Sequence, residues 1–171
     1  GDPTALKPDF EKDAAVFVFD FLGQSRRVVI QLFPQDAPVH VANFQKLVRD
    51  EYYENMAVHR TIPNYLVQMG DPQSKDPQSR AAWGLGGPGY TIPPEIRRTH
   101  GLGAVGMARV GDRLNPERRS NGSQFYITTG KLDQFDGKYT VFGQVIQGYE
   151  FLQDLSELPA DENDNPYTRV A

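Results

Sequence analysis

Arg60 and Gln68 are the side chains whose types and spacing most directly suggest chemistry in this sequence. They occur in VHRTIPNYLVQMGD at 58–71, together with Tyr65 and Leu66. A strand, a turn and a second strand would direct Arg60 and Gln68 toward one aromatic and aliphatic surface, where a guanidinium needs a ligand or a buried acceptor. From this segment alone, a structural contact between the two side chains is favoured over a catalytic role.

Two later segments each combine a turn with a strand. In NGSQFYITT at 121–129, Gln124 and Tyr126 alternate with apolar residues, so one face of the strand can bind while the other packs. In FDGKYTVFGQV at 135–145, an Asp-Gly turn precedes the strand. Each segment alone is compatible with simple barrel core, and it is their joint occurrence with 58–71 that carries information about function.

The whole chain has the composition of one ordinary globular domain. Hydrophobic residues make up 39% and charged residues 23% of its 171 positions, and 16 Gly and 13 Pro indicate many turns, as in a β-rich body. Residues 1–13 are polar and contain two prolines. We therefore expect an N-terminal arm at 1–13 and a single domain at 14–171.

Charge and cysteine content exclude several classes of function. The formal net charge of −4 gives no general attraction to nucleic acid, and the absence of cysteine excludes disulfides, thiolate metal sites and a cysteine nucleophile. No apolar run is long enough to cross a membrane. We also expect the protein to be a monomer. The first residues lack the apolar centre of a signal peptide, but a leader removed before Gly1 would leave the same start. A cytoplasmic location and a periplasmic or secreted one both remain open.

Sequence periodicity predicts the elements that must position these side chains. Residues 15–22 and 27–33 are β-branched and aromatic runs that form a hairpin, and a helix begins at Pro38. The apolar stripe of this helix consists of Val41, Phe44, Leu47 and Val48. Further strands are predicted at 58–61, 65–69, 104–108, 124–129 and 139–146, a long loop at 71–100 and a second helix at 149–158.

In their order and spacing, the three segments resemble the signature blocks of the cyclophilin family, FHR…P…QGGD, NGSQFF and LDGK…VFG. The likeness extends over about residues 15–158. It implies a mainly β fold, a closed eight-stranded antiparallel β-barrel capped by two α-helices. It also implies a peptidyl-prolyl cis-trans isomerase that acts on X–Pro bonds in peptides and unfolded chains and assists folding. The alternative is a weakly active or inactive proline-peptide-binding module on the same fold, against which the presence of Arg60 and Gln68 argues.

The resemblance also assigns roles within the site, residue by residue. Arg60 matches the catalytic arginine of the family, and Gln68 is expected to orient it. The remaining positions match residues that contact substrate: Tyr65, Leu66, Tyr126 and Phe135 as walls of a proline pocket, Met107 as part of its floor, Gln124 as a polar orienting group, Ala108 and Arg109 where the backbone pairs with the peptide, and Tyr139 at the rim. No cofactor and no metal are implied.

Three positions depart from the best-known family pattern. Gln134 and Tyr139 stand where the form most sensitive to cyclosporin has a tryptophan and a histidine, so we expect weakened cyclosporin binding. Tyr126 replaces a phenylalanine, and its hydroxyl needs a partner or an opening to solvent.

The stretch 110–120 is longer than in the common form of the family, and we expect it to form a loop beside the substrate groove. Its arginines, with Arg109, would favour peptides with acidic flanks, although a solvated surface is the favoured interpretation of such a charge run.

Other motifs are better explained by structure. Residues 84–89 match GxGxxG, but no βα unit surrounds them and Pro88 interrupts them, which argues against a nucleotide site. The sequon at 121–123 is interpreted as a structural turn beside the groove. The spacing of the three histidines fits no common zinc motif.

Overall fold

The fold begins with a long antiparallel hairpin, in a computed structural model that describes residues 13–171. Strands β1 (Ala14–Phe21) and β2 (Gln24–Leu32) pair along their whole length around a two-residue turn. Leu22 and Gly23 both have positive φ angles, 52° and 79°, as the tight turn of a right-twisted hairpin requires. The hairpin was predicted, with a longer turn. Apart from Asp13, the predicted N-terminal arm lies outside the described residues.

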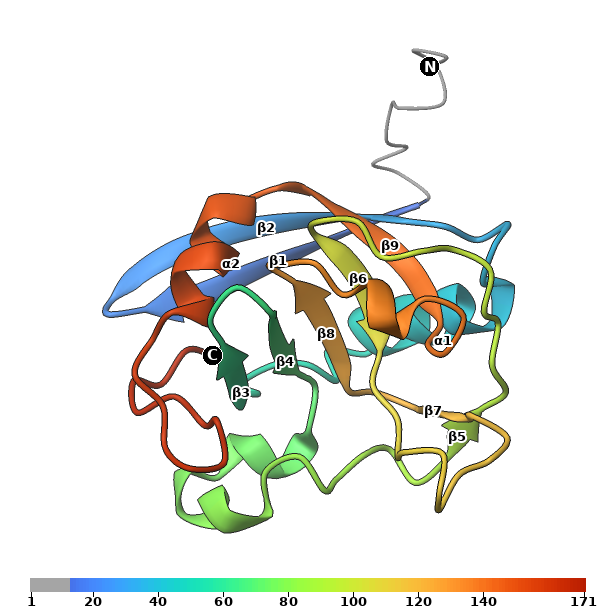
Figure 1. Cartoon of the computed structure of the whole chain (residues 1–171). Helices are drawn as coiled ribbons and strands as arrows, with labels where there is room; N and C mark the ends of the chain where they lie inside the picture. Colours follow the sequence, from blue (N-terminus) through green and yellow to red (C-terminus); the bar gives the residue numbers. More distant parts are fainter. Residues whose placement is uncertain (1–12) are drawn as a thin grey trace.

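Seven antiparallel strands of residues 13–171 form one curled sheet (Figure 1). Its order is β1-β2-β9-β6-β8-β4-β3. The strands after the hairpin are β3 (Arg60–Ile62), β4 (Leu66–Met69), β6 (Ala104–Met107), β8 (Phe125–Thr128) and β9 (Val141–Gln147). A separate small ladder joins β5 (Thr91–Ile92) to β7 (Ser120–Asn121). The expected mainly β, barrel-like architecture is confirmed, with seven strands in the main sheet instead of eight.

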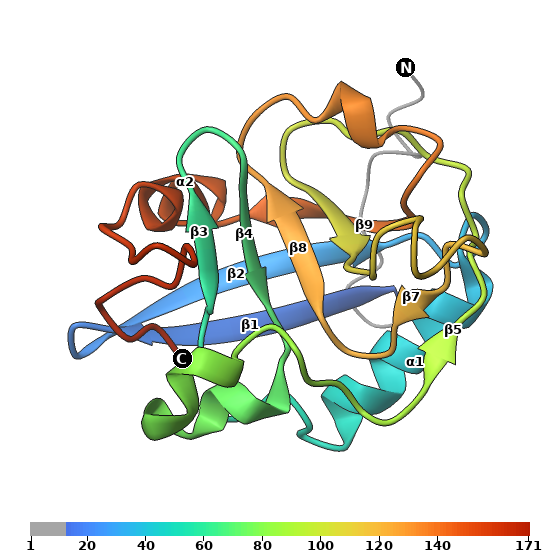
Figure 2. The ribbon, with the colours of Figure 1, turned by 60° about the horizontal axis from the view of Figure 1, so that its bottom comes forward.

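The two edge strands of this sheet, β1 and β3, are bridged by the C-terminal residues (Figure 2). The Asp20 N–H donates to the Ala171 carbonyl over 2.8 Å, and the Ala171 N–H donates back over 3.4 Å. The Val58 N–H, just before β3, donates to the Val170 carbonyl over 2.8 Å. The C-terminal residues therefore close the seam of the barrel, and β1 and β3 do not pair directly.

Two helices pack against the sheet, as expected from their periodicity. Helix α1 (Pro38–Arg49) buries Val41, Phe44 and Leu47, three residues of the predicted stripe. Helix α2 (Tyr149–Ser156) buries Leu152 and Leu155. The main core lies inside the curled sheet and is rich in aromatic rings, among them Phe17, Phe44, Tyr53, Phe125 and Phe142. No helix within residues 13–171 has the length and apolarity needed to cross a membrane.

The long connection at 71–100 is more ordered than the sequence suggested. It contains two 3₁₀ helices, η1 (Pro72–Lys75) and η2 (Pro77–Ala82), each begun by an aspartate whose side chain accepts a backbone N–H. The first of these, Asp71, is fully buried and also accepts the N–H groups of Gly84 and Gly86. One carboxylate thus fixes the glycine-rich turn beside the strands that carry Arg60 and Gln68.

Candidate active site

Arg60 and Gln68 are direct partners in the register of β3 and β4. The Arg60 Nη1 donates to Gln68 Oε1 over 3.2 Å, which is the structural contact that the sequence favoured. This contact uses one of the five N–H groups of a guanidinium, and it is the only hydrogen bond of the Arg60 side chain within residues 13–171. Arg60 is half-buried. Its guanidinium is therefore oriented by Gln68 and still has N–H groups available for a ligand.

Behind Gln68, a chain of amide hydrogen bonds leads to the glycine-rich turn. Gln68 Nε2 donates to Gln124 Oε1 over 3.0 Å. Gln124 Nε2 in turn donates to the carbonyls of Gly84 and Gly86, over 3.0 and 2.6 Å. Both glutamine side chains are buried, so their donors and acceptors need these partners. The turn anchored by Asp71 thus fixes the amide of Gln124, and through it the side chain that faces Arg60.

The predicted wall residues form a second, small apolar cluster separate from the main core. It includes Tyr126, the register partner of Gln68. Its buried members are Leu66, Tyr126 and Leu132, and Tyr65, Ala108, Phe135 and Tyr139 pack against them. The aromatic rings meet edge to face, with centroid separations of 5.9 Å for both Tyr65–Phe135 and Tyr126–Phe135. Leu132 was not predicted, although it is an apolar residue only three positions before Phe135, the first residue of the segment 135–145.

Phe135 reaches this cluster from η3 (Asp133–Phe135), whereas Leu66 and Tyr126 come from β4 and β8. In the register, Tyr126 lies opposite Gln68 on one side and Gly106 on the other. A Cβ at Gly106 would lie 2.3 Å from the Tyr126 hydroxyl oxygen. The Tyr126 ring therefore lies across the surface of β6, in space that a glycine leaves open.

The hydroxyl of Tyr126 has the partner that its burial requires. It lies 2.6 Å from Nε2 of His100, and the two rings are stacked with an angle of 13° between their planes. Burial raises the pKa of Tyr126 well above its ordinary value, so the phenol stays protonated. The role of His100 was not predicted, because its position lies outside all three motifs.

Met107, Ala108 and Arg109 are consecutive but occupy three different environments. Met107 is fully buried in the main core, so it does not join the pocket cluster for which it was predicted. Ala108 packs against the cluster, but its N–H donates to the Gln124 carbonyl and its carbonyl accepts from Asn121 N–H. The backbone groups of Arg109 have no hydrogen-bond partner within residues 13–171. Of the two positions expected to pair with a peptide, Arg109 is thus the one whose backbone is unpaired.

The loop at 110–120 is held against the rim of the cluster by its own charges. Asp112 pairs with Arg109 and Arg118, over 3.0 and 3.1 Å, and the hydrogen bond from Arg118 lowers the pKa of Asp112. Arg119 donates to the Thr91 hydroxyl over 2.7 Å. The Arg109 guanidinium also lies 4.3 Å above the Tyr139 ring. Much of the positive charge of this loop is therefore already satisfied within the protein.

The sequon at 121–123 and His40 belong to hydrogen-bond networks that are structural. The Asn121 side-chain oxygen accepts the N–H groups of Ser123 and Gln124, so the sequon forms a turn. His40 lies 2.7 Å from both the Ser120 hydroxyl and a Glu95 oxygen, but Ser120 is only 1% exposed and no substrate can reach it. In the described part of the chain, no three histidine or acidic side chains converge as a metal site would require.

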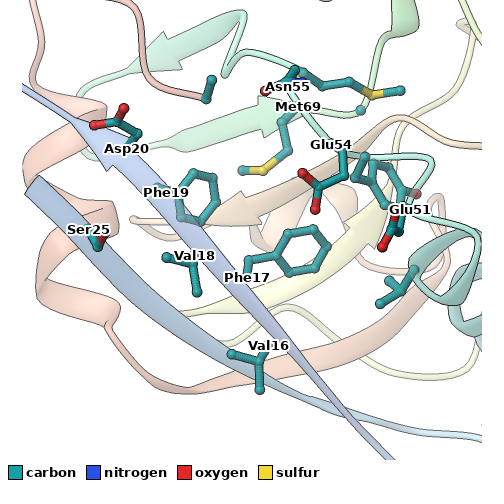
Figure 3. A pocket seen from close by; sticks show the side chains of 15 residues that line it. Val16, Phe17, Val18, Phe19, Asp20, Ser25, Glu51, Glu54, Asn55 and Met69 are labelled. Carbon is teal, nitrogen blue, oxygen red and sulfur yellow. The ribbon is translucent and has the colours of Figure 1, made fainter. Parts of the chain in front are cut away.

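A pocket of about 570 Å³ lies elsewhere, at the seam of the barrel (Figure 3). Residues 16–20 of β1 line one side, and Glu51, Glu54 and Asn55 line the other. None of the residues in the apolar cluster around Tyr126 belongs to its lining. The chemistry of Arg60 and its neighbours is therefore on a different surface of the molecule.

Comparisons with known proteins agree with this geometry. The family model described as cyclophilin type peptidyl-prolyl cis-trans isomerase/CLD matches residues 18–171. Peptidyl-prolyl cis-trans isomerase B of Bacillus subtilis is 36% identical over 138 residues, which cover 79% of this chain and 87% of that protein. Peptidyl-prolyl cis-trans isomerase-like 3 of Gallus gallus is 37% identical over 138 residues, 79% of each chain. Other relatives are longer: the chain spans 23% of peptidyl-prolyl cis-trans isomerase-like 2 of Gibberella zeae.

Solved structures of cyclophilin-type isomerases are also similar to this chain. A crystal structure of a Cryptosporidium parvum cyclophilin type peptidyl-prolyl cis-trans isomerase superimposes with a TM-score of 0.78 at 28% identity, covering 92% of both chains. A second crystal structure of that protein, in the presence of the dipeptide Ala-Pro, gives a TM-score of 0.77 at 27% identity, covering 93% of this chain and 94% of that one.

Proposed function

The chain belongs to the cyclophilin-type peptidyl-prolyl cis-trans isomerase family, and from this premise we propose that Arg60 is the residue that lowers the barrier to rotation. The reaction of the family is rotation about X–Pro bonds. We assign the proline ring to the cluster formed by Leu66, Tyr126 and Phe135 with their aromatic neighbours. The observation that carries this proposal is the half-buried guanidinium, which Gln68 orients and which is otherwise unpaired within residues 13–171. Gln68 itself lies opposite Tyr126 of the cluster in the strand register.

The chemistry needs a group that acts only while the bond is twisted. Amide resonance opposes rotation with a barrier of about 18–20 kcal/mol. When the bond twists, the prolyl nitrogen leaves conjugation and its lone pair can accept a hydrogen bond. A guanidinium N–H of Arg60 directed at this nitrogen stabilises the twisted state and not the planar one, which is the requirement for catalysis. Arginine suits the role because it remains protonated at any physiological pH.

The apolar cluster supplies the other half of the mechanism. It holds the proline ring while the carbonyl side of the bond turns, and it removes water from around the guanidinium, which strengthens the hydrogen bond. A reduction of the barrier by about 7 kcal/mol corresponds to roughly five orders of magnitude in rate, within reach of a few oriented contacts. No nucleophile is required, because no covalent bond is made or broken.

The unpaired backbone of Arg109 supports a binding mode for the rest of the substrate. Its N–H and carbonyl are available to pair with the peptide on the amino side of the proline. The relative crystallised in the presence of Ala-Pro supports a proline dipeptide as the minimal ligand. In our proposal the partners are proline-containing peptides and unfolded chains, whose X–Pro bonds are exposed.

We also propose that this chain binds cyclosporin more weakly than the most sensitive members of the family do, on the basis of Gln134 and Tyr139. Gln134 lies at the rim, where its amide approaches the Tyr65 hydroxyl at 3.4 Å, and it presents less apolar area than an indole would. The Tyr139 ring packs 4.5 Å from that of Phe135 and under the Arg109 guanidinium, so it is engaged within the protein.

The test is an isomerisation assay on a proline peptide, by protease coupling or by NMR exchange, with wild type, Arg60→Ala and Arg60→Lys. We expect both variants to lose at least about 100-fold in kcat/KM, because a transition-state hydrogen bond in a dry site is worth that much. Peptide affinity should change less than about threefold. Slow exchange that does not depend on Arg60, together with intact peptide binding, would instead favour the proline-peptide-binding module.

A further inference from the structure

His100 lies beneath the proline pocket, and both of its ring nitrogens are used. Nε2 lies 2.6 Å from the Tyr126 hydroxyl, and Nδ1 lies 2.8 Å from Oδ1 of Asp136. The same carboxylate oxygen accepts the backbone N–H of His100 over 2.7 Å. The histidine is only 6% exposed, so these partners replace water. Because both ring nitrogens and the backbone N–H of His100 have hydrogen-bond partners, the ring is held in one orientation.

The donors and acceptors of this network can be placed atom by atom. Asp136 is ionised at neutral pH, because the hydrogen bonds from His100 lower its pKa, and a carboxylate can only accept. Nδ1 of His100 must therefore carry the proton and donate it to Asp136. When the ring carries no second proton, Nε2 has a lone pair, and the Tyr126 hydroxyl donates to it. In this arrangement, each donor among the His100, Asp136 and Tyr126 side chains faces an acceptor.

The network connects the separate elements that carry the pocket. Tyr126 belongs to β8, whereas Asp136 directly follows η3, whose last residue is Phe135. The His100 ring stacks on Tyr126 and meets Phe135 edge to face, with a centroid separation of 5.9 Å. His100 itself comes from the segment between β5 and β6. It therefore fixes the aromatic wall contributed by β8 relative to the aromatic wall contributed by η3.

We propose that His100 is a positioning residue of the isomerase, which holds Tyr126 and Phe135 in the arrangement that receives the proline ring. This inference rests on the proposed function of the pocket. His100 acts through the two aromatic side chains and does not contact the substrate. It offsets the cost of having a tyrosine in the wall of an apolar pocket, because it gives the hydroxyl a fixed acceptor on the side away from the ligand.

Loss of the acceptor has a definite physical consequence. A buried hydroxyl without a partner is unfavourable, so Tyr126 would rotate toward solvent or draw a water molecule into the pocket. Either change reduces the apolar surface that the proline ring contacts. Loss of the Asp136 contact instead frees η3, and with it Phe135. The two sides of the histidine therefore control two different walls.

A matched pair of substitutions separates these two sides. The amide oxygen of His100→Gln can lie near the position of Nε2 and keep an acceptor for Tyr126. The amide N–H of His100→Asn can lie near Nδ1 and keep the donor to Asp136. We expect His100→Asn to raise the KM for a proline peptide roughly tenfold, the loss typical of one buried hydrogen bond, with kcat within about threefold of wild type. His100→Gln should recover at least half of that loss on a logarithmic scale.

A double-mutant cycle with Tyr126→Phe provides the second readout. Once the hydroxyl is absent, His100→Asn should change KM by less than about threefold, because the contact that it removes no longer exists. His40→Asn is the control for loss of a buried, doubly hydrogen-bonded histidine away from the apolar cluster. It should lower the melting temperature and leave KM unchanged.

Three results would overturn the inference: a wild-type KM in folded His100→Asn, equal KM values for the Gln and Asn variants, or additive effects in the cycle. These failures are distinct from failure of the proposed function, which is tested by Arg60→Ala in the same assay. If Arg60→Ala loses activity while the His100 variants keep the wild-type KM, only the positioning role of His100 is rejected.

Discussion

Arg60 and Gln68 lie opposite each other on β3 and β4, and the amide oxygen of Gln68 accepts a hydrogen bond from the guanidinium over 3.2 Å. The amide nitrogen of Gln68 is committed at the same time to Gln124, whose own amide is fixed by two carbonyls of the glycine-rich turn. The orientation of the Arg60 guanidinium is therefore set by groups as far away as that turn.

Replacing Gln68 by leucine should lower kcat while leaving substrate affinity nearly unchanged. The leucine keeps most of the side-chain volume but removes the acceptor that orients Arg60, so the guanidinium samples unproductive positions. We expect kcat to fall roughly tenfold, and KM to stay within about twofold, in the proline-peptide assay. Gln147→Leu, on an exposed part of β9, is the matched control. A Gln68→Leu enzyme with wild-type kcat would show that the contact is purely structural.

Gly106→Ala should disturb the Tyr126 wall of the pocket. The added methyl group would lie 2.3–2.8 Å from three atoms of the Tyr126 side chain, closer than van der Waals contact allows. We expect a loss of about 1–3 kcal/mol in the free energy of unfolding, as overpacking usually costs, and weaker binding of proline peptides. Urea denaturation and peptide titration measure the two effects. Gly111→Ala, which has open space around the new methyl, should change neither.

Gln134→Trp should increase affinity for cyclosporin. An indole at the rim adds apolar area and one N–H donor next to the Tyr65 and Phe135 rings, where Gln134 presents an amide. We expect Kd to fall at least tenfold in isothermal titration, with peptide turnover within about twofold of wild type. Gln134→Ala serves as the control and should not tighten binding. If the tryptophan variant binds no better than wild type, the rim residue does not explain the drug affinity.

Acid should destabilise the fold through His59. Burial lowers the pKa of His59 from 6.5 to about 4, although the charge of Asp71 and the Gln124 side chain act in the opposite direction. Between these two pH values the unfolded chain binds a proton that the folded chain does not, so stability falls as the pH decreases from about 6.5 to about 4. The shift corresponds to about 3 kcal/mol, fully lost below pH 4.

The measurement is urea denaturation across that pH window, with His59→Leu as the comparison. The leucine variant cannot bind the proton, so its stability should depend less steeply on pH. His40, whose pKa burial also lowers, contributes a slope of the same sign in both proteins. Parallel curves for wild type and His59→Leu would mean that another group accounts for the acid sensitivity.

Local patterns predicted much of this site because strand alternation is a local property. It predicted that Gln124 and Tyr126 share one face, and both lie beside Gln68 in the structure: Gln124 accepts its amide N–H, and Tyr126 is its register partner. The same alternation explains why Met107 points into the core. On β6, Gly106 lies beside the Tyr126 ring, so its neighbour Met107 must face the other way. Strict use of the two-residue period would have identified this position.

His100 and Leu132 could not be predicted in the same way, because their roles depend on contacts between distant segments. His100 meets Tyr126 across 26 positions and Asp136 across 36 positions. Neither separation follows a helix or strand period. The one available signal was the tyrosine hydroxyl itself, since a buried phenol requires an acceptor and the sequence offers few neutral ones.

The hydrogen bonds of Val170 and Ala171 with Val58 and Asp20 also determine when the domain can be completed during synthesis. During synthesis β1 and β3 emerge well before Val170 and Ala171, the residues that bridge them. Until then both edge strands present unpaired backbone groups, which are prone to pair with other chains. Closure of the barrel therefore follows the synthesis of all seven strands and depends on contacts of long sequence separation, which form slowly. The isomerase domain thus has a late closing step in its own folding.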